Sequence, residues 1–337
     1  MFELLKKEAK SKKTTPARLL ELSRNSDASV QLAVAKNANT SVQALEYLAG
    51  HGKFTILKGV AAHKNVTPAV LERLAAHKQW TVCEAVALNP NAPTKLLERL
   101  ARHKDPNVRK AVLKNINCKP ALLEVLAKDP DVHVRSVVAG NRNTLPNVVR
   151  ALAEDADGLV RAAAVSTLDR LGNVERLSVL AKDPDAQVRL AIVKLMPWNP
   201  NLHDHLVTDT DVIVRGQVGD HPQLPDAAAL ILARDPSDAV REIIAHRDRL
   251  SKAVLEVLVA DPNPAVRRSL AYAKVDDVPA WVLEHLALDE DSDVRWQVAY
   301  HWRTPKDTLR RLETDPAETV RSAARKTLAQ DRGLSEP

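Results

Sequence analysis

The sequence predicts an all-α solenoid of about twelve two-helix repeats, and three observations carry this prediction. A Val-Arg signature, clearest in the stretch from Lys128 to Asn143, recurs from one end of the chain to the other. The recurrences follow a period of 26 residues, with two intervals of 28. Each copy holds two short helix patterns separated by polar turns, and its apolar spacing is that of helices. We expect one elongated domain over residues 1–337, with an N-terminal cap (1–25), repeats (26–329) and a frayed tail (330–337).

The apolar residue of the Val-Arg step sets the register of the repeats. Helices this short are not stable alone, so their apolar faces must pack on neighbouring repeats. The register positions are Val30, Ile56, Val82, Val108, Val134, Val160, Val188, Val214, Val240, Val266, Val294 and Val320.

The first helix of a repeat is expected to follow an Asp-Pro step, as after Asp129 and Pro130, where the aspartate would cap the helix and the proline would occupy its first turn. The second helix is expected to start at a Thr-Pro step, as at Thr15, Thr67 and Thr304. It carries apolar residues three positions apart, namely Leu71 with Leu74, Leu97 with Leu100, Leu123 with Leu126 and Leu255 with Leu258.

Asparagine pairs such as Asn37 with Asn39 and Asn89 with Asn91 fall between the two helices. Asparagine tolerates the left-handed conformation that ends a helix, so these residues are interpreted as helix terminators. The segment before the first repeat, 1–13, is predicted to form an amphipathic helix with its lysines outward. The extra residues of the two longer repeats are placed near 168–172 and 273–278.

Composition favours a soluble chain of packed short helices. Hydrophobic residues make up 45% of the chain and are mostly Ala, Val and Leu, which suits the packing of short helices. The two cysteines, Cys83 and Cys118, are too few for a disulfide framework or a zinc cluster. No long apolar run predicts a membrane span, and the first residues lack the apolar core of a signal peptide. A cytoplasmic protein with no membrane partner is therefore expected.

Charge is distributed unevenly along the chain. The net charge is +6 overall, but residues 1–120 hold 21 Lys and Arg against 9 Asp and Glu, whereas the remainder is mildly acidic. This asymmetry predicts that the N-terminal third meets a polyanion or an acidic protein surface.

Aspartate and arginine occupy matched columns of the repeats. Nine consecutive repeats carry arginine after the register residue, from Arg109 to Arg321, and eight carry aspartate five positions before it, from Asp129 to Asp315. Every repeat with the aspartate also has the arginine, and only the repeat of His103 and Arg109 is mixed. The pattern predicts a ladder of ion pairs within a repeat or between adjacent repeats. Since a paired guanidinium attracts phosphate weakly, the column is not assigned to nucleic-acid binding.

The recurring pattern Asp-Pro-x-x-x-Val-Arg-x-x-Val-Ala-x-Asn-x-Asn-Thr-Pro-x-x-Leu-Leu-Glu-x-Leu-Ala, seen in pieces at 89–101 and 129–144, resembles the leucine-rich repeat variant family, an α-solenoid of the HEAT-like group. The resemblance covers nearly the whole chain. It implies two layers of short helices, one of which can be 3₁₀, wound into a right-handed superhelix. Some members hold an iron–sulfur cluster on N-terminal cysteines, but no cysteine precedes Cys83, so no cofactor is expected. HEAT-like glycosylases of alkylated DNA are similar in fold, yet their catalytic constellation has no match in this sequence.

A basic group of side chains is the first candidate partner-binding site. Lys95, Arg99 and Arg102 share one helix face, and basic residues of neighbouring repeats extend them into a predicted stripe that could follow phosphates or dock an acidic protein. The alternative is an ordinary solvated surface. The residues assigned to the stripe are Lys58, Lys64, Arg73, Lys95, Arg99, Arg102, Lys110 and Lys114.

An aromatic group near the C-terminal end is the second candidate. Large amphipathic rings at variable positions suit a protein hot spot or a base-stacking platform. The alternative is that they close the last core layer of the array. The residues are Tyr272, Trp296, Tyr300 and Trp302.

Histidines are interpreted as structural. His51, His77 and His103 take the place of the aspartate in three successive repeats, too far apart to share a metal, and are expected to act as neutral caps. His203 and His205 are expected at the surface. No phosphate loop, nucleophile with its base or paired acid motif is recognisable, so no small-molecule substrate is evident. The sequence thus predicts a non-enzymatic binding scaffold for a protein partner. The alternatives are DNA binding through the basic stripe and, third, an alkylated-base glycosylase.

Overall fold

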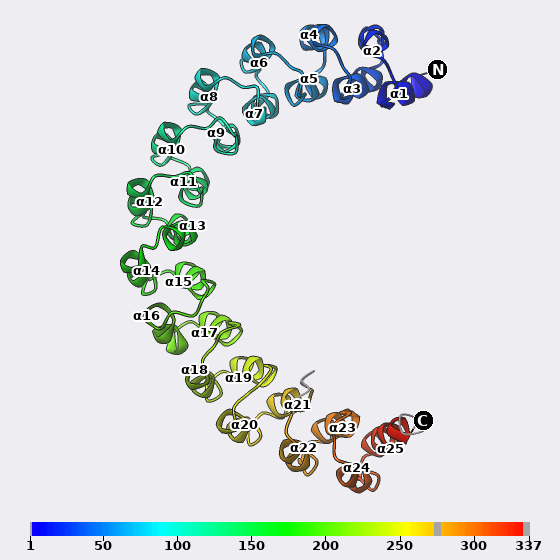
Figure 1. The fold of residues 1–337 in the computed structure, drawn as a ribbon, viewed down its shortest axis with the longest axis vertical. Coiled ribbons are helices and arrows are strands. Elements are labelled where there is room, and N and C mark those ends of the chain that lie inside the picture. The colour runs from blue at the N-terminus through cyan, green and yellow to red at the C-terminus, as the bar shows by residue number, and fades with distance from the viewer. Residues whose placement is uncertain (1, 273–277, 333–337) are drawn as a thin grey trace. The chain divides into compact units, whose positions relative to one another are not determined.

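The computed structural model describes residues 2–272 and 278–332, with side chains described as far as residue 330. Within these ranges the chain forms helices and turns without a strand (Figure 1). The predicted α-solenoid is therefore confirmed. The chain divides into two units, unit 1 over Met1–Arg176 and unit 2 over Leu177–Pro337, and each is described by itself.

Unit 1 alternates helices of two layers. The odd-numbered helices, which carry the register residues, pack on one another in sequence, and the even-numbered helices lie beside them (Figure 1). Its helices are α1 (Phe2–Lys10), α2 (Pro16–Ser23), α3 (Ala28–Lys36), α4 (Val42–His51), α5 (Phe54–Ala61), α6 (Pro68–Leu74), α7 (Trp80–Leu88), α8 (Thr94–Leu100), α9 (Pro106–Leu113), α10 (Pro120–Leu126), α11 (Val132–Ala139), α12 (Pro146–Leu152) and α13 (Gly158–Arg170).

Unit 2 repeats this alternation, and the boundary between the units falls within α14 (Val174–Leu180). In both units the odd-numbered helices lie on the inner side of the curve that the unit itself describes in Figure 1. We call them the inner layer and the even-numbered helices the outer layer. The helices of unit 2 are α15 (Ala186–Val193), α16 (Pro200–His203), the 3₁₀ helix η1 (Asp204–Thr208), α17 (Val212–Gly219), α18 (Asp226–Leu232), α19 (Asp238–Ala245), α20 (Lys252–Leu258), α21 (Pro264–Tyr272), α22 (Ala280–Leu286), α23 (Ser292–Tyr300), α24 (Lys306–Leu312) and α25 (Glu318–Arg332).

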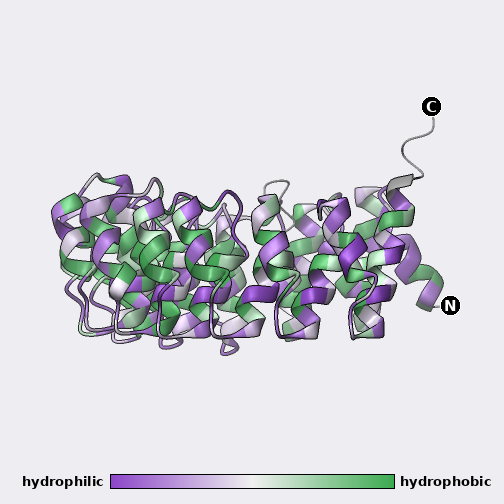
Figure 2. Ribbon diagram, turned by 90° about the horizontal axis from the view of Figure 1, so that it is seen from below, coloured by the Kyte–Doolittle hydropathy of each residue, from purple (hydrophilic) through white to green (hydrophobic). Residues whose placement is uncertain are grey.

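The core of each unit lies between its two layers. All twelve register residues are at most 1% exposed, and the paired leucines of the outer helices are at most 6% exposed. Figure 2 shows hydrophobic residues within the helices and hydrophilic residues concentrated in the connecting turns. Each buried Val or Leu contributes about 1.5–3 kcal/mol, so the stack of repeats supplies the stability that single helices lack.

The helix caps differ in part from the sequence prediction. Thr15 and Thr67 cap α2 and α6 as expected, each hydroxyl accepting a hydrogen bond from the backbone N–H three residues later. The aspartates of the Asp-Arg column, in contrast, are not the inner-layer caps. Asp131 caps α11, accepting from the backbone N–H groups of His133 and Val134. Asp129 lies two residues earlier and accepts from the N–H of Asp131, because the chain makes an Asx turn before the helix begins.

The asparagines between the helices do not act through a left-handed backbone, so that interpretation was wrong. Asn37 and Asn89 have extended backbones with φ of −78° and −72°. Their side-chain amides donate to backbone carbonyls of the preceding repeat; the Nδ2 of Asn89 lies 2.7 Å from the oxygen of Ala61 and 3.1 Å from that of His63. Asn91 makes the equivalent pair of hydrogen bonds one turn further on. The asparagines therefore tie successive repeats together and satisfy carbonyls at the ends of helices.

The structure also locates the irregular parts of the array. The first longer repeat places its extra residues where predicted, since α13 extends to Arg170 and the turn after it contains Gly172 at φ +65°. The second insertion, near 273–278, lies almost entirely outside the described residues. Both layers are α-helical, and η1 is the single 3₁₀ helix that the described ranges contain. Across those same ranges, no helix has the length and apolar character to cross a membrane.

Candidate partner-binding surfaces

The Asp-Arg columns form the predicted ladder, and the structure fixes its direction. Arg135 donates from Nε and Nη2 to the carboxylate of Asp155 at 2.7 and 3.0 Å, and from Nη1 to the backbone carbonyl of Asp129 at 2.9 Å. Arg135 thus contacts its own repeat through a carbonyl and the following repeat through a carboxylate. The same arrangement joins Arg109 to Asp129, Arg189 to Asp209, Arg215 to Asp235, Arg241 to Asp261, Arg267 to Asp289, and Arg295 to Asp315.

This direction explains both ends of the columns. Arg109 needs no aspartate in its own repeat because its partner, Asp129, belongs to the next one. Arg321 follows the last register residue, Val320, and its guanidinium contacts Glu318 of its own helix. The one-repeat offset is therefore the reason why the arginine column begins one repeat before the aspartate column.

The charged groups of the ladder stabilise one another, so its guanidinium groups serve a structural role. The hydrogen bond to Asp261 raises the pKa of Arg241, and the hydrogen bond from Arg135 holds the pKa of the Asp155 carboxyl below its usual range. The paired side chains are largely buried; that of Asp261 is 2% exposed and that of Arg241 is 12% exposed. Bidentate, buried guanidinium groups of this kind have few donors left for a phosphate.

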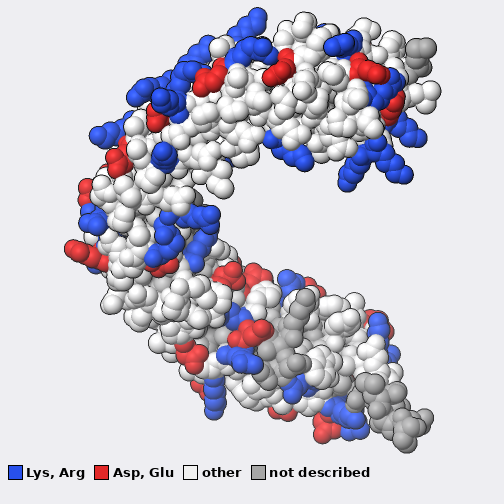
Figure 3. All heavy atoms as spheres, turned by 45° about the horizontal axis from the view of Figure 1, so that its top comes forward, with Lys and Arg blue, Asp and Glu red and all other residues white. Residues whose placement is uncertain are grey.

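The predicted basic stripe does not form one surface. Arg73, Lys95 and Arg99 lie on the outer helices α6 and α8, and Arg102 lies in the turn after α8. The other residues belong to the inner layer: Lys58 on α5, Lys64 after it, Lys110 on α9 and Lys114 at its C-cap. Figure 3 shows Lys and Arg gathered along the outer margin of unit 1, with further groups on its inner side.

Several of the basic side chains also have partners. Arg99 donates to Glu72 of the preceding outer helix at 2.6 Å, and Arg73 donates to the backbone carbonyl of Glu46 at 3.3 Å. Lys58 lies 3.8 Å from Glu84 on the inner layer. Exposed pairs of this kind contribute little stability, but they lower the local positive charge. The structure therefore divides the predicted stripe between the two layers, and on the inner layer it separates Lys58 and Lys64 from Lys110 and Lys114.

Most of the predicted aromatic group shares one surface. Tyr272, Trp296 and Tyr300 lie on the inner layer of unit 2, and the rings of Trp296 and Tyr300 stack with centroids 5.5 Å apart. Trp302 lies in the turn after α23, where the guanidinium of Arg303 covers its ring. All four side chains are exposed, from 37% for Trp296 to 67% for Trp302. Such exposed rings do not close a core layer, which removes the reason for the end-capping interpretation.

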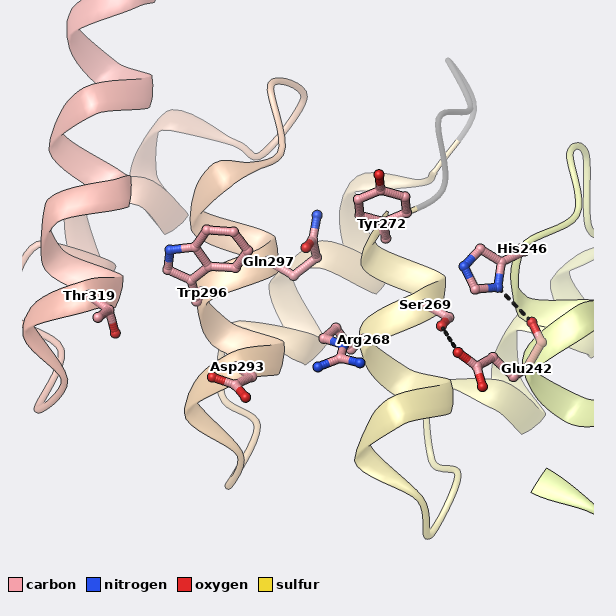
Figure 4. A pocket seen from close by; sticks show the side chains of 9 residues that line it. All are labelled: Glu242, His246, Arg268, Ser269, Tyr272, Asp293, Trp296, Gln297 and Thr319. Carbon is pink, nitrogen blue, oxygen red and sulfur yellow. Dashed lines mark hydrogen bonds between the residues drawn. The ribbon is translucent and has the colours of Figure 1, made fainter. Parts of the chain in front are cut away.

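A groove of about 570 Å³ runs past two of these rings along the inner layer of unit 2. Arg268 lies at its centre, and Figure 4 places it between Trp296 and Asp293 on one side and Ser269 and Glu242 on the other. The Ser269 hydroxyl donates to the Glu242 carboxylate at 3.1 Å. The groove therefore combines an apolar ring with separate positive and negative groups.

Sequence reasoning missed Glu242, Arg268 and Asp293, although a signal existed. Glu242, Arg268 and Trp296 follow their register residues by two positions, and this position faces outward from the inner layer. Because the position varies from repeat to repeat while the core positions do not, it could have marked the surface.

A second hollow, of about 600 Å³, lies in unit 1 between α3 and α5 and was also missed. It includes the predicted Lys58 and Lys64, together with the unpredicted Lys36 and Phe54. Its signal in the sequence was Gly59, a glycine in the interior of a helix, where glycine is unfavourable without a packing reason.

The histidines of the aspartate column are not the helix caps that the sequence predicted, since Gln79 and Asp105 are the N-caps of α7 and α9. His77 and His103 each accept, at Nδ1, the backbone N–H two residues later, just as the column aspartates do. His51 instead contacts the carbonyl of Tyr47 and is exposed. The expectation for His203 was wrong: its side chain is 0% exposed and stacks on Trp198. Burial lowers the pKa of His203, so this ring is a neutral core group.

Together, the repeats, layers and inner-layer grooves define a helical-repeat scaffold. A solved structure described as "a leucine-rich repeat variant with a novel repetitive protein structural motif" is similar to this chain at 26% identity and a TM-score of 0.54, covering 67% of this chain and 88% of its own. The predicted resemblance is thereby confirmed. Kap121p bound to RanGTP aligns at 13% identity and a TM-score of 0.41, over 99% of this chain and 41% of its own. No protein-family model and no curated protein matches the chain.

Proposed function

We propose that this protein is a non-enzymatic scaffold whose inner layer in unit 2 binds a segment of a partner protein. The observation that carries the proposal is the exposed Trp296, stacked on Tyr300 and set beside Arg268 in the groove. Tryptophan, tyrosine and arginine dominate the energetics of protein interfaces, because large rings and planar guanidinium groups bury much surface with little loss of side-chain freedom.

The geometry suits an extended segment more than a small molecule. The groove is open along the row of inner helices, and its lining residues come from α19, α21, α23 and α25, which are held in line by the ladder. A volume of about 570 Å³ accommodates a few side chains of a peptide. The polar groups alternate in sign along it, which would fix the register of a bound chain.

The polar contacts of the groove favour binding over catalysis. Ser269, Glu242 and His246 are neighbours, a combination that could suggest a hydrolytic triad. However, the Ser269 hydroxyl donates to Glu242, whereas the Nδ1 of His246 pairs with the backbone carbonyl of Glu242 in its own helix. In such a triad the histidine accepts the proton of the serine hydroxyl, and a hydrogen bond between His246 and Ser269 is not among those of the described side chains. Two free thiols, Cys83 and Cys118, further support a reducing, cytoplasmic setting.

Nucleic acid remains the alternative partner, and the structure weakens the sequence argument for it. The stripe that motivated it is divided between two layers, and Arg99 and Lys58 have carboxylate partners. A phosphate backbone requires several basic groups that are available along one path.

The test is a peptide-display selection on the full chain, followed by measurement of the Kd of the selected peptides for the wild-type protein and for the Trp296→Ala variant. We expect selected peptides to bind the wild-type protein with a micromolar Kd and the variant at least about tenfold more weakly. Trp302→Ala is the matched control, because this tryptophan is also exposed but lies outside the groove, and it should change Kd less than about twofold. Peptides that bind the wild-type protein and the Trp296→Ala variant equally well would refute the proposal. It would also fail if no peptide were selected and duplex DNA bound with a steep salt dependence.

A further inference from the structure

The hollow in unit 1 has an apolar floor. Leu32 and Ala35 of α3 face Gly59 of α5 and Ala62 at its C-cap, and Phe54 lies at the edge with 52% of its surface exposed. Isolated apolar residues are common on protein surfaces and need no explanation. An exposed phenylalanine beside an apolar hollow is instead typical of a binding site.

Gly59 keeps this floor open. A Cβ atom at this position would lie 3.2 Å from the Cβ of Ala35 and 3.7 Å from Cδ1 of Leu32. The missing side chain allows α3 and α5 to approach and leaves the space above them unfilled.

Three lysines surround the hollow. Lys36 ends α3, Lys58 lies on α5 and Lys64 lies in the turn that follows α5. All three are exposed, and no carboxylate lines the hollow. Lys58 has a carboxylate partner, Glu84 of the next inner helix. This pair is weak, because its Nζ and Oε2 atoms are 3.8 Å apart and the Lys58 side chain is 52% exposed. The rim is therefore complementary to a ligand with negative charge on both sides of an apolar group.

The floor offers few polar partners to a nucleotide base. His63, the polar ring among the lining residues, has both nitrogens occupied: Nε2 pairs with the carbonyl of Asn37 at 2.8 Å, and Nδ1 accepts the backbone N–H of Asn65 at 3.0 Å. A base with its hydrogen-bonding edges buried here would leave them unsatisfied, which is unfavourable. An aliphatic side chain has no hydrogen bonds to lose on entering.

We propose that the hollow between α3 and α5 binds an acidic peptide segment of a partner protein, with one large aliphatic side chain seated on the Leu32, Ala35, Gly59 floor and flanking carboxylates paired with Lys36, Lys58 and Lys64. This site is distinct from the groove in unit 2, and it goes beyond the proposed function by specifying a second contact and its chemistry.

The experiment uses the full-length protein and a fluorescein-labelled synthetic peptide with a central leucine flanked on each side by glutamates. Two matched peptides replace the leucine with serine or the glutamates with lysines. We expect the leucine peptide to bind in fluorescence anisotropy, and each matched peptide to bind at least about tenfold more weakly. Equal binding of the serine peptide, or the absence of binding by the leucine peptide, would overturn the proposal.

Variants assign the binding to the hollow. The double substitution Lys36→Glu with Lys64→Glu should weaken binding at least about tenfold, because it replaces two attractions by repulsions. Lys78→Glu reverses an exposed lysine of the same unit outside the hollow and should have little effect. Ala62→Trp should fill the hollow and abolish binding while leaving the lysines in place.

Two further readouts separate this proposal from others. Circular dichroism and Tm matching the wild type would show that the variants remain folded. Single-stranded DNA that competes with the leucine peptide and binds more tightly, with the same dependence on Lys36 and Lys64, would assign the rim to nucleic acid and contradict the proposal. Binding that depends on Trp296 should be unchanged in the lysine variants, so the failure of either site can be recognised independently.

Discussion

Removing one member of a buried ladder pair should destabilise unit 2 far more than removing one member of an exposed ion pair. In the pair of Arg241 with Asp261, the guanidinium donates to the carboxylate at 2.6 and 3.0 Å and to the carbonyl of Asp235 at 2.8 Å. The substitution Asp261→Ala removes two charge-assisted hydrogen bonds and also the acceptor of the Asn263 N–H at 2.8 Å. Because it leaves a buried guanidinium without its counter-ion, we expect a loss of about 3–5 kcal/mol in the free energy of unfolding.

A double-mutant cycle measures the coupling directly. Arg241→Met alone should also be strongly destabilising, since it leaves the 2% exposed Asp261 carboxylate without its guanidinium. The double variant should be less destabilised than the two single losses combined, with a coupling of about 2 kcal/mol or more. Urea denaturation followed by circular dichroism gives the free energies, and amide hydrogen exchange in α19 and α21 reports where the loss occurs.

An exposed ion pair of similar length is the control. The Nη1 of Arg310 lies 2.7 Å from Oδ1 of Asp307, but the two side chains are 66% and 91% exposed. Arg310→Ala should therefore change the free energy of unfolding by less than about 1 kcal/mol. The reasoning is refuted if Asp261→Ala is as mild as this control, or if the two single losses of the cycle simply add.

Three other predictions concern pH, asparagine and cysteine. Arg135 lowers the pKa of the Asp155 carboxyl in the folded protein. The ion pair should therefore contribute its full stability above the unfolded carboxyl pKa of about 3.9, and this stability should be lost as the pH falls through the folded pKa. Equal urea midpoints at pH 7 and pH 3 would contradict this. Asn89→Ala should cost about 1–3 kcal/mol, because it removes two hydrogen bonds to the preceding repeat and leaves the carbonyl of Ala61 without this donor. Asn143→Ala, at an exposed side chain, should be nearly neutral in thermal denaturation. Burial raises the pKa of the Cys83 thiol. A thiol reagent should therefore label the half-exposed Cys118 first and Cys83 only in denaturant. Rapid labelling of Cys83 in the native protein would contradict this and would show that α7 opens.

Much of the fold followed from the sequence because a repeat array reports the same physical requirement many times. One apolar register position per repeat, read twelve times, located the core without any knowledge of tertiary contacts. The matched columns likewise indicated that Asp155 and Arg135 take part in pairs, because a buried charge needs a counter-charge. The helix starts at Thr15 and Thr67 followed from local capping chemistry.

The candidate binding surfaces followed less well, since periodicity alone does not say which side of a layer a position faces. Lys95 and Lys110 look equivalent in a list of basic residues, yet they lie on different layers. The aromatic group was easier to identify because Trp296 and Tyr300 are one helical turn apart on the same helix. Gly59 gave a hint of the hollow, but its neighbours across the hollow come from the preceding repeat.

The sequence by itself determined the period, the helical class, the core positions and the existence of the ion pairs, because each depends on spacing along one chain. Only the tertiary structure decided that Arg241 reaches the following repeat and that Asn89 reaches the preceding one. It also decided that His203 is buried. The physical reason is that hydrogen bonds and burial depend on how repeats stack, and an interval of one repeat in the sequence is compatible with contacts in either direction until the helices are packed.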